Sequence, residues 1–130
     1  MKLVIEILSD EVLPTLRAIV GKKLVEVYGL SQKNAAERLG LTQPAISQYK
    51  RDLRGYRTAL FTENPAVLSA LDAAAKKFAT GSVQLSDVAE EFSDICRLIV
   101  SEGIAHRIHQ ETGAEVGDCE FCYGSKEKKK

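Results

Sequence analysis

Three cysteines form the first pattern in the sequence that could support chemistry. Cys119 and Cys122 form a C-x-x-C pair near the end of the chain, and Cys96 lies in a segment with helical periodicity. Two thiolates at this spacing can bind one metal ion or cluster, but the same spacing serves thiol–disulfide exchange. A thioredoxin-like enzyme would place the pair after a strand and at the start of a helix, whereas here it follows the last predicted helix. We therefore favour metal ligation over a thiol–disulfide oxidoreductase, and we do not expect an enzyme.

Two histidines lie between the cysteines and are candidates for a fourth ligand. His106 and His109 are three residues apart, which places them on neighbouring faces of a short helix. For either one, an ordinary surface or core position is an equal alternative, and Cys96 on an apolar helical face can be simply a small buried side chain. Three thiolates and one imidazole suit a closed tetrahedral Zn²⁺ site, and the same set can hold an iron–sulfur cluster.

The second pattern is a row of polar side chains on one face of a predicted helix. Stepping about 100° per residue from Ile46 separates an apolar side from a polar side. Glutamine and arginine on the polar side could pair with adenine and guanine, and serine could meet a base edge. Lysines and arginines beside them suit phosphate contacts. The predicted DNA-binding residues are Lys33, Thr42, Gln43, Pro44, Ser47, Gln48, Lys50, Arg51, Arg54 and Arg57.

Two short helices joined by a tight turn are expected to position this polar face. Gly40 stands where the turn needs a residue that tolerates a positive φ. The Thr42 hydroxyl can cap the second helix, and Pro44 is allowed in its first turn. An ordinary helical hairpin in a small all-α domain is the alternative. The residues predicted to face inward are Ala35, Ala36 and Leu39 in the first helix, and Ile46, Tyr49 and Leu53 in the second.

The run from Gln32 to Leu53 resembles the helix-turn-helix of bacterial and archaeal transcription regulators. TQPAISQY, which begins at Thr42, is similar to the start of their recognition helix. Together with the long helix before it, the unit resembles archaeal regulators of the lambda-repressor-like (XRE-like) class, some of which carry a C-terminal cysteine cluster. The resemblance implies sequence-specific binding to double-stranded DNA and control of transcription. We expect a homodimer whose two reading heads lie roughly 34 Å apart on DNA.

The resemblance also bears on the cysteines. Those regulators tend to have a further cysteine, and His106 stands at its place when the chains are aligned on Cys96. The implied ligand set is then Cys96, His106, Cys119 and Cys122, which departs from an all-cysteine pattern. An iron–sulfur cluster that senses redox state or iron is the favoured cofactor, because its loss would act as a switch. Structural Zn²⁺ is the alternative.

Charge is distributed unevenly, although the net charge of the 130 residues is zero. Residues 1–57 contain ten Lys and Arg against six Asp and Glu, whereas residues 58–125 contain four against eleven. The basic charge therefore accompanies the predicted reading head, which favours DNA binding. No apolar run approaches the roughly 20 residues that cross a bilayer, and no signal-peptide pattern is seen, so we expect a cytoplasmic protein without membrane contact.

The periodicity of the whole chain predicts an all-α fold. We expect a DNA-binding domain over 1–60, a helical dimerisation and metal-binding region over 61–125, and a disordered lysine-rich tail over 126–130. The second region is expected to consist of a hairpin of two long helices followed by a cysteine-containing C-terminal segment. The connection from Gly55 to Glu63 shows no clear period. The predicted helices outside the central pair run from about Asp10 to Tyr28, from Asn64 and Pro65 to Gly81, from a Ser86 cap to Ile99, and from Ile104 to Thr112.

Overall fold

The computed structural model describes residues 3–51, 58–81 and 83–111, and in these ranges it contains helices and turns but no strand. The predicted all-α fold is therefore confirmed. The helices are α1 (Val4–Ile7), the π-helical segment η1 (Leu8–Val12), α2 (Leu13–Glu26), α3 (Gln32–Leu39), α4 (Gln43–Arg51), α5 (Thr58–Thr62), α6 (Pro65–Thr80), α7 (Leu85–Ser101) and α8 (Ile104–Glu111).

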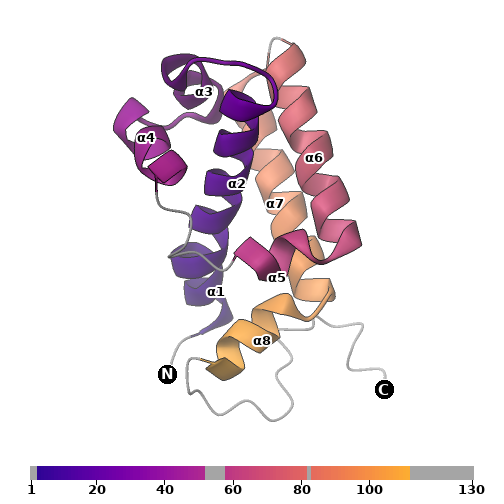
Figure 1. The fold of residues 1–130 in the computed structure, drawn as a ribbon. Coiled ribbons are helices and arrows are strands. Elements are labelled where there is room, and N and C mark those ends of the chain that lie inside the picture. Colours follow the sequence, from indigo (N-terminus) through magenta and orange to yellow (C-terminus); the bar gives the residue numbers. More distant parts are fainter. Residues whose placement is uncertain (1–2, 52–57, 82, 112–130) are drawn as a thin grey trace.

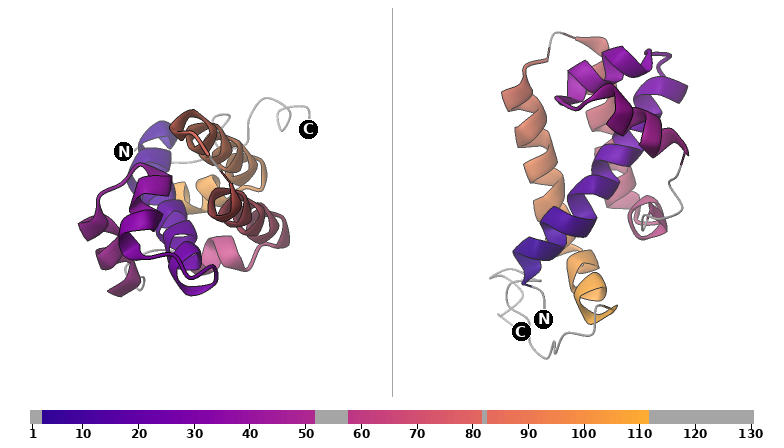
Figure 2. Two further views of the ribbon diagram at one scale, coloured as in Figure 1. Left: turned by 90° about the horizontal axis from the view of Figure 1, so that it is seen from above. Right: turned by 90° about the vertical axis from the view of Figure 1, so that its left-hand side faces the viewer.

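Helix α2 runs through the middle of the molecule (Figure 1). It packs against α6 and α7 on one side and against α3 and α4 on the other, as the two further views also show (Figure 2). Helix α8 lies across one end of the molecule and contacts both α1 and α7. The first long helix thus supports the α3–α4 pair from behind, because α2 packs against both helices of the pair.

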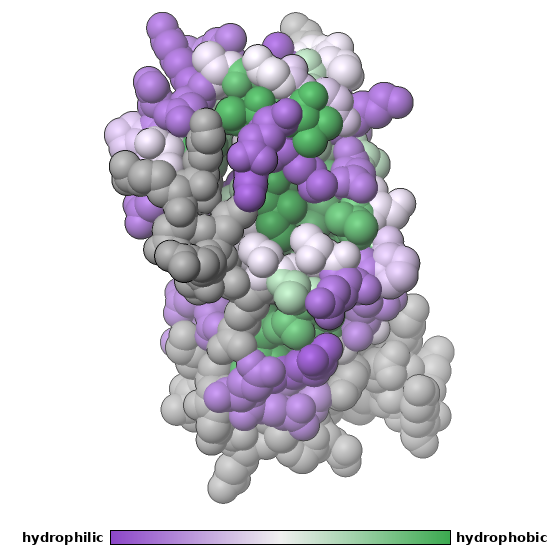
Figure 3. Space-filling view, in the orientation of Figure 1, coloured by the Kyte–Doolittle hydropathy of each residue, from purple (hydrophilic) through white to green (hydrophobic). Residues whose placement is uncertain are grey.

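One hydrophobic core joins the two halves of the chain. The buried apolar side chains form a single cluster that extends from Ile7 to Ile108 and includes residues of both α3–α4 and α6–α7. On the face seen in Figure 3, apolar side chains gather over the middle of the molecule and polar ones surround them. The predicted boundary after residue 60 therefore does not separate two hydrophobic cores, because one core spans it. The different functions proposed for the two regions remain a prediction.

The start of the first long helix differs from the prediction. Helical backbone begins at Val4 rather than near Asp10, and it continues through η1 into α2. In η1 the amide of Leu13 donates to the carbonyl of Leu8, five residues earlier. This wider turn directly precedes Pro14, which has no amide hydrogen to donate within the helix. Burial of Ile7 stabilises the extension, because α1 packs against α8.

Two further boundaries differ for local reasons. The connection after Gly55 contains α5, which is held by Phe61, a fully buried side chain. Helix α7 begins one residue before Ser86, so the predicted serine cap is wrong. Its N-cap is Gln84, whose backbone N–H donates to the Asp87 carboxylate at 3.2 Å. The predicted helix start at Asn64 and Pro65 is confirmed, since the Asn64 side chain accepts from the Val67 amide at 3.1 Å and Pro65 begins α6.

Helices α6 and α7 pair as the predicted hairpin. The rings of Phe78 and Phe92 lie 6.0 Å apart between their centroids in a tilted arrangement, and both side chains are buried. Across the hairpin the Lys77 ammonium forms an ion pair with the Glu91 carboxylate at 2.7 Å. Within the ranges described here, no helix combines the length and apolar character that crossing a bilayer requires.

Candidate functional site

The α3–α4 pair is built by local hydrogen bonds, and the sequence predicted two of these features, the turn at Gly40 and the Thr42 cap. The Ser31 hydroxyl accepts from the Asn34 amide at 3.0 Å and caps α3. Gly40 ends α3 with a φ of 68°, and the Leu41 amide donates back to the Ala36 carbonyl at 2.9 Å. Thr42 Oγ1 then accepts from the amide of Ala45 at 3.3 Å and caps α4. The turn is therefore closed at both ends, and it fixes α4 relative to α3.

Apolar contacts hold the pair against α2. Ile46 is 1% exposed and belongs to the core cluster, as do the buried residues Ala35, Ala36 and Leu39 of α3. These assignments confirm the predicted inward face of α3 and the inward position of Ile46 in α4. Of the other residues expected to face inward from α4, the Tyr49 side chain and Leu53 lie outside the described part of the structure.

Polar side chains of α4 lie on its outer side. Gln43, Pro44 and Gln48 are exposed, and Ser47 is half-buried. Gln43, Pro44 and Ser47 line a shallow depression of about 410 Å³ together with Gln32 from the start of α3. Figure 1 shows α4 at the outer edge of the molecule, with α2 between it and α6–α7. A long polymeric ligand could therefore approach this face without meeting the hairpin.

The other predicted DNA-binding residues fall into two groups. Lys33 on α3 and Thr42 are both exposed. The backbone of Lys50 and Arg51 belongs to α4, but their side chains, and the whole of Arg54 and Arg57, lie outside the described residues.

Arg38 is a structural residue of this site that the sequence patterns did not single out. From the last turn of α3, its Nη1 donates to the carbonyl oxygens of Phe78 at 2.5 Å and Gly81 at 2.9 Å. Both carbonyls belong to the C-terminal end of α6, where acceptors lack helical partners and the helix dipole favours a cation. No sequence pattern indicated this contact, because an arginine on a polar helix face looks like any exposed residue and its partners lie about forty residues away.

Two of the predicted metal ligands lie on described helices. Cys96 is a half-buried thiol on α7, and His106 is buried on α8 with 6% of its surface exposed. In the portion of the chain that is described, no three His, Cys, Asp or Glu side chains converge. Cys119 and Cys122 lie outside that portion, as does the side chain of His109, so the predicted metal centre remains a prediction.

The electrostatic setting of Cys96 combines opposing effects. Burial raises the pKa of its thiol, and this effect outweighs the lowering of the pKa by the charges of Arg17 and Arg97. The neutral thiol is therefore favoured over the thiolate, unless a metal ion replaces the proton.

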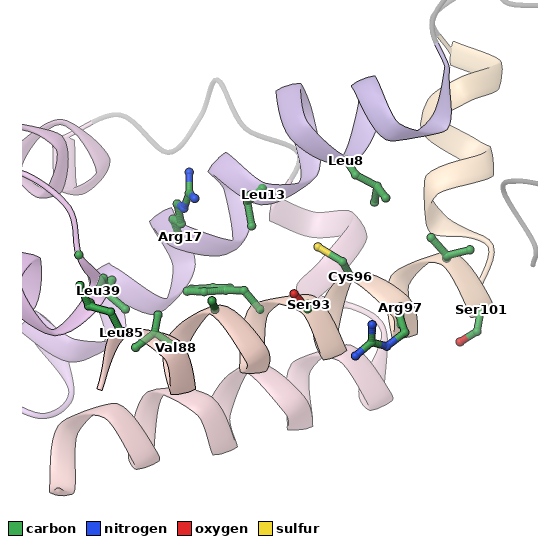
Figure 4. A pocket seen from close by; sticks show the side chains of 14 residues that line it. Leu8, Leu13, Arg17, Leu39, Leu85, Val88, Ser93, Cys96, Arg97 and Ser101 are labelled. Atoms are coloured by element: carbon green, nitrogen blue, oxygen red, sulfur yellow. The ribbon is translucent and has the colours of Figure 1, made fainter. Parts of the chain in front are cut away.

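A second concave feature was not predicted from the sequence. A groove of about 850 Å³ runs along α7 where it faces η1 and α2, and it ends at the turn after α3 (Figure 4). Leu85 and Ala89 of α7 line this groove and are exposed, although both side chains are apolar. Only the tertiary arrangement reveals the groove, since its walls come from segments about seventy residues apart.

Comparison of the chain with models of protein families, with curated proteins and with solved structures found no match.

Proposed function

We propose that the protein is a sequence-specific DNA-binding transcription regulator and that the α3–α4 pair is its helix-turn-helix, with α4 as the recognition helix. The observation that carries the proposal is the division of α4 into two sides. Ile46 is buried against the core, whereas Gln43 and Gln48 are exposed. A helix held in this way presents amides that can bond adenine edges in a major groove.

The surroundings of α4 support the same function. Gln32 and Gln43 share one shallow depression, so the beginnings of α3 and α4 lie close together. Helix N-termini suit phosphate oxygens because their amides point outward with a partial positive charge. Lys33, exposed on the first turn of α3, adds a cation at the same end. Phosphates contacted there would set the position of α4 in the groove.

The regulator is further proposed to act as a homodimer with a C-terminal iron–sulfur cluster that responds to redox state or iron. The support is the sequence pattern of three cysteines and His106, together with the need for two reading heads on a pseudo-palindromic site. Cys96 and His106 would supply ligands from α7 and α8, which contact each other. A structural Zn²⁺ ion bound by the same four residues is the alternative.

The test is selection of bound sequences from a random DNA pool, followed by titration of the selected site. Replacing Gln48 by alanine should weaken binding to that site by about 1–3 kcal/mol and relax the preference at one base pair. Gln110→Ala is the matched control, because it removes an exposed glutamine of α8. No enrichment from the pool, or equal losses on every DNA sequence, would contradict the base-reading role of α4.

A further inference from the structure

The groove between α2 and α7 has the lining of a ligand site. Its walls are mainly apolar side chains, among them Leu8 and Leu13 on one side and Val88 and Phe92 on the other. Its volume of about 850 Å³ lies within the range of small-molecule pockets in proteins. An alkyl chain lying along these residues would leave water for an apolar surface, which favours binding.

The charged side chains that line the groove are both positive. Arg17 belongs to α2 and Arg97 to α7, and no Asp or Glu lines the groove. Figure 4 shows the two arginines on the two walls, with Cys96 between them and its sulfur directed toward the helix that carries Leu13. Arg97 already forms an ion pair with Asp94. Among the described residues no ion pair involves Arg17, so its guanidinium remains available to an anion.

We propose that this groove binds a small amphiphilic anion from solution, a molecule with an unbranched alkyl chain and one carboxylate. The alkyl chain would lie along the leucines and Phe92, and the carboxylate would pair with the guanidinium of Arg17. Charge complementarity selects this class, because a neutral chain would leave the cation without a counterion and a cationic ligand would be repelled.

The groove also reaches the α3–α4 pair. Leu39 and Gly40 line its end, where Leu85 of α7 approaches the turn, and this turn directly precedes α4. An occupant of the groove would therefore contact the connection that orients α4. The binding site itself does not depend on DNA binding, and the tests below contain no DNA, so the two proposals can fail separately.

The location of binding is tested by calorimetric titration of the full chain with decanoate. Ser93 is an exposed residue in the wall of the groove, and Ser93→Trp would fill the space without burying the new ring in the core. Ser69→Trp on α6 is the matched control, because Ser69 is also exposed but does not line the groove. We expect at least a tenfold loss of affinity, roughly the effect of blocking most apolar contacts, for Ser93→Trp alone. Absent binding, or equal binding by both variants, would overturn the proposal.

The class of ligand is tested by removing the charge of Arg17 in the protein or the charge of the ligand. Arg17→Gln should weaken decanoate binding about tenfold, as expected for loss of a charge-assisted pair, while leaving the weaker binding of decanol unchanged. Arg107→Gln, which neutralises an exposed arginine on α8 outside the groove, should change neither. Equal affinity of the wild-type protein for decanoate and decanol would overturn the anionic assignment.

Two other occupants are distinguished by further measurements. Flotation with phosphatidylglycerol vesicles would detect binding to a membrane surface. We expect the wild-type protein and Arg17→Gln to behave alike in this assay. Sedimentation velocity would detect a second copy of the chain in the groove, and we expect the same oligomeric state for Ser93→Trp and Ser69→Trp. Recruitment that depends on Arg17, or dissociation caused by Ser93→Trp alone, would overturn the proposal of a free ligand.

Discussion

Arg38 and Phe78 join α3 to the end of α6, since the guanidinium of the first donates to the carbonyl oxygen of the second at 2.5 Å. The same nitrogen also donates to the Gly81 carbonyl at 2.9 Å. One side chain therefore ties the proposed reading head to the α6–α7 hairpin and satisfies two acceptors that the end of α6 leaves open. This contact, the Gly40 turn and the Lys77 ion pair each lead to a prediction about stability.

Replacing Arg38 by methionine should lower the free energy of unfolding by about 1–3 kcal/mol, because the partly buried Phe78 carbonyl and the exposed Gly81 carbonyl lose a charged donor. Arg38→Lys should recover part of the loss, since an ammonium can still donate to one carbonyl. Urea unfolding followed by circular dichroism measures the change. Arg107→Met, on an exposed arginine of α8, is the control and should have little effect. Equal stability of the two methionine variants would contradict the bridging role of Arg38.

Three glycines allow conformational strain to be separated from crowding. Gly40 has a φ of 68°, and an added Cβ would lie 3.0 Å from Leu85 Cδ2. Gly29 has a similar φ of 72° with nothing within 4 Å, and Gly81 is extended and open. Alanine at Gly29 should cost about 1–2 kcal/mol from the left-handed backbone alone. Alanine should cost at least as much at Gly40, where the exposed end of the Leu85 side chain must also shift, and almost nothing at Gly81, as measured by urea unfolding. Any other order would refute this account of the turn.

The ion pair between Lys77 and Glu91 predicts a pH dependence of stability. The hydrogen bond to Glu91, followed by its charge, raises the pKa of Lys77 above its ordinary value of 10.5. A raised pKa means that the folded state binds the proton more tightly, so the stabilisation is complete below pH 10.5 and disappears as the pH rises through the raised value. Lys77→Met should therefore be slightly less stable than wild type at neutral pH, and the difference should vanish at high pH.

Lys76→Met is the matched control for this ion pair, because Lys76 is the exposed neighbour on α6 and has no ion pair among the described residues. The difference between the two variants should also shrink in high salt, since surface pairs are screened. Thermal unfolding measured across the pH range provides the comparison. A difference that persists unchanged into strong alkali would contradict the assignment to Lys77.

The cofactor prediction is tested by anaerobic purification followed by absorption spectroscopy and metal analysis. A brown protein whose visible absorbance disappears in Cys96→Ser is the expected result, because loss of one thiolate weakens the binding of a cluster. Ser101→Ala is a control, since Ser101 lies on the same helix and is absent from the predicted ligand set. A colourless protein with one zinc ion per chain would show that the site holds a structural metal ion instead of a cluster. A metal-free protein would refute both cofactor predictions.

Much of the α3–α4 pair could be predicted because its signals are local. Ser31, Gly40 and Thr42 act on amides or dihedral angles within a few residues of themselves, so a short stretch of chain specifies both caps and the turn. The same reasoning located Asn64 and Pro65 at the start of α6. It misplaced the start of the first helix, because burial of Ile7 under α8 decides whether residues before Pro14 continue the helix.

The sequence by itself determined that the chain is helical, where most helices end, and which side of α4 is apolar, since these depend on hydrogen bonds and periodicity over a few residues. Only the tertiary structure decided that Arg38 reaches the end of α6, that Leu85 and Ala89 stay exposed, and that α2 and α7 leave a groove between them. Such features depend on how segments far apart in the chain pack together. The physical reason is that an apolar stripe specifies that a face is buried but leaves open which partner covers it and how completely.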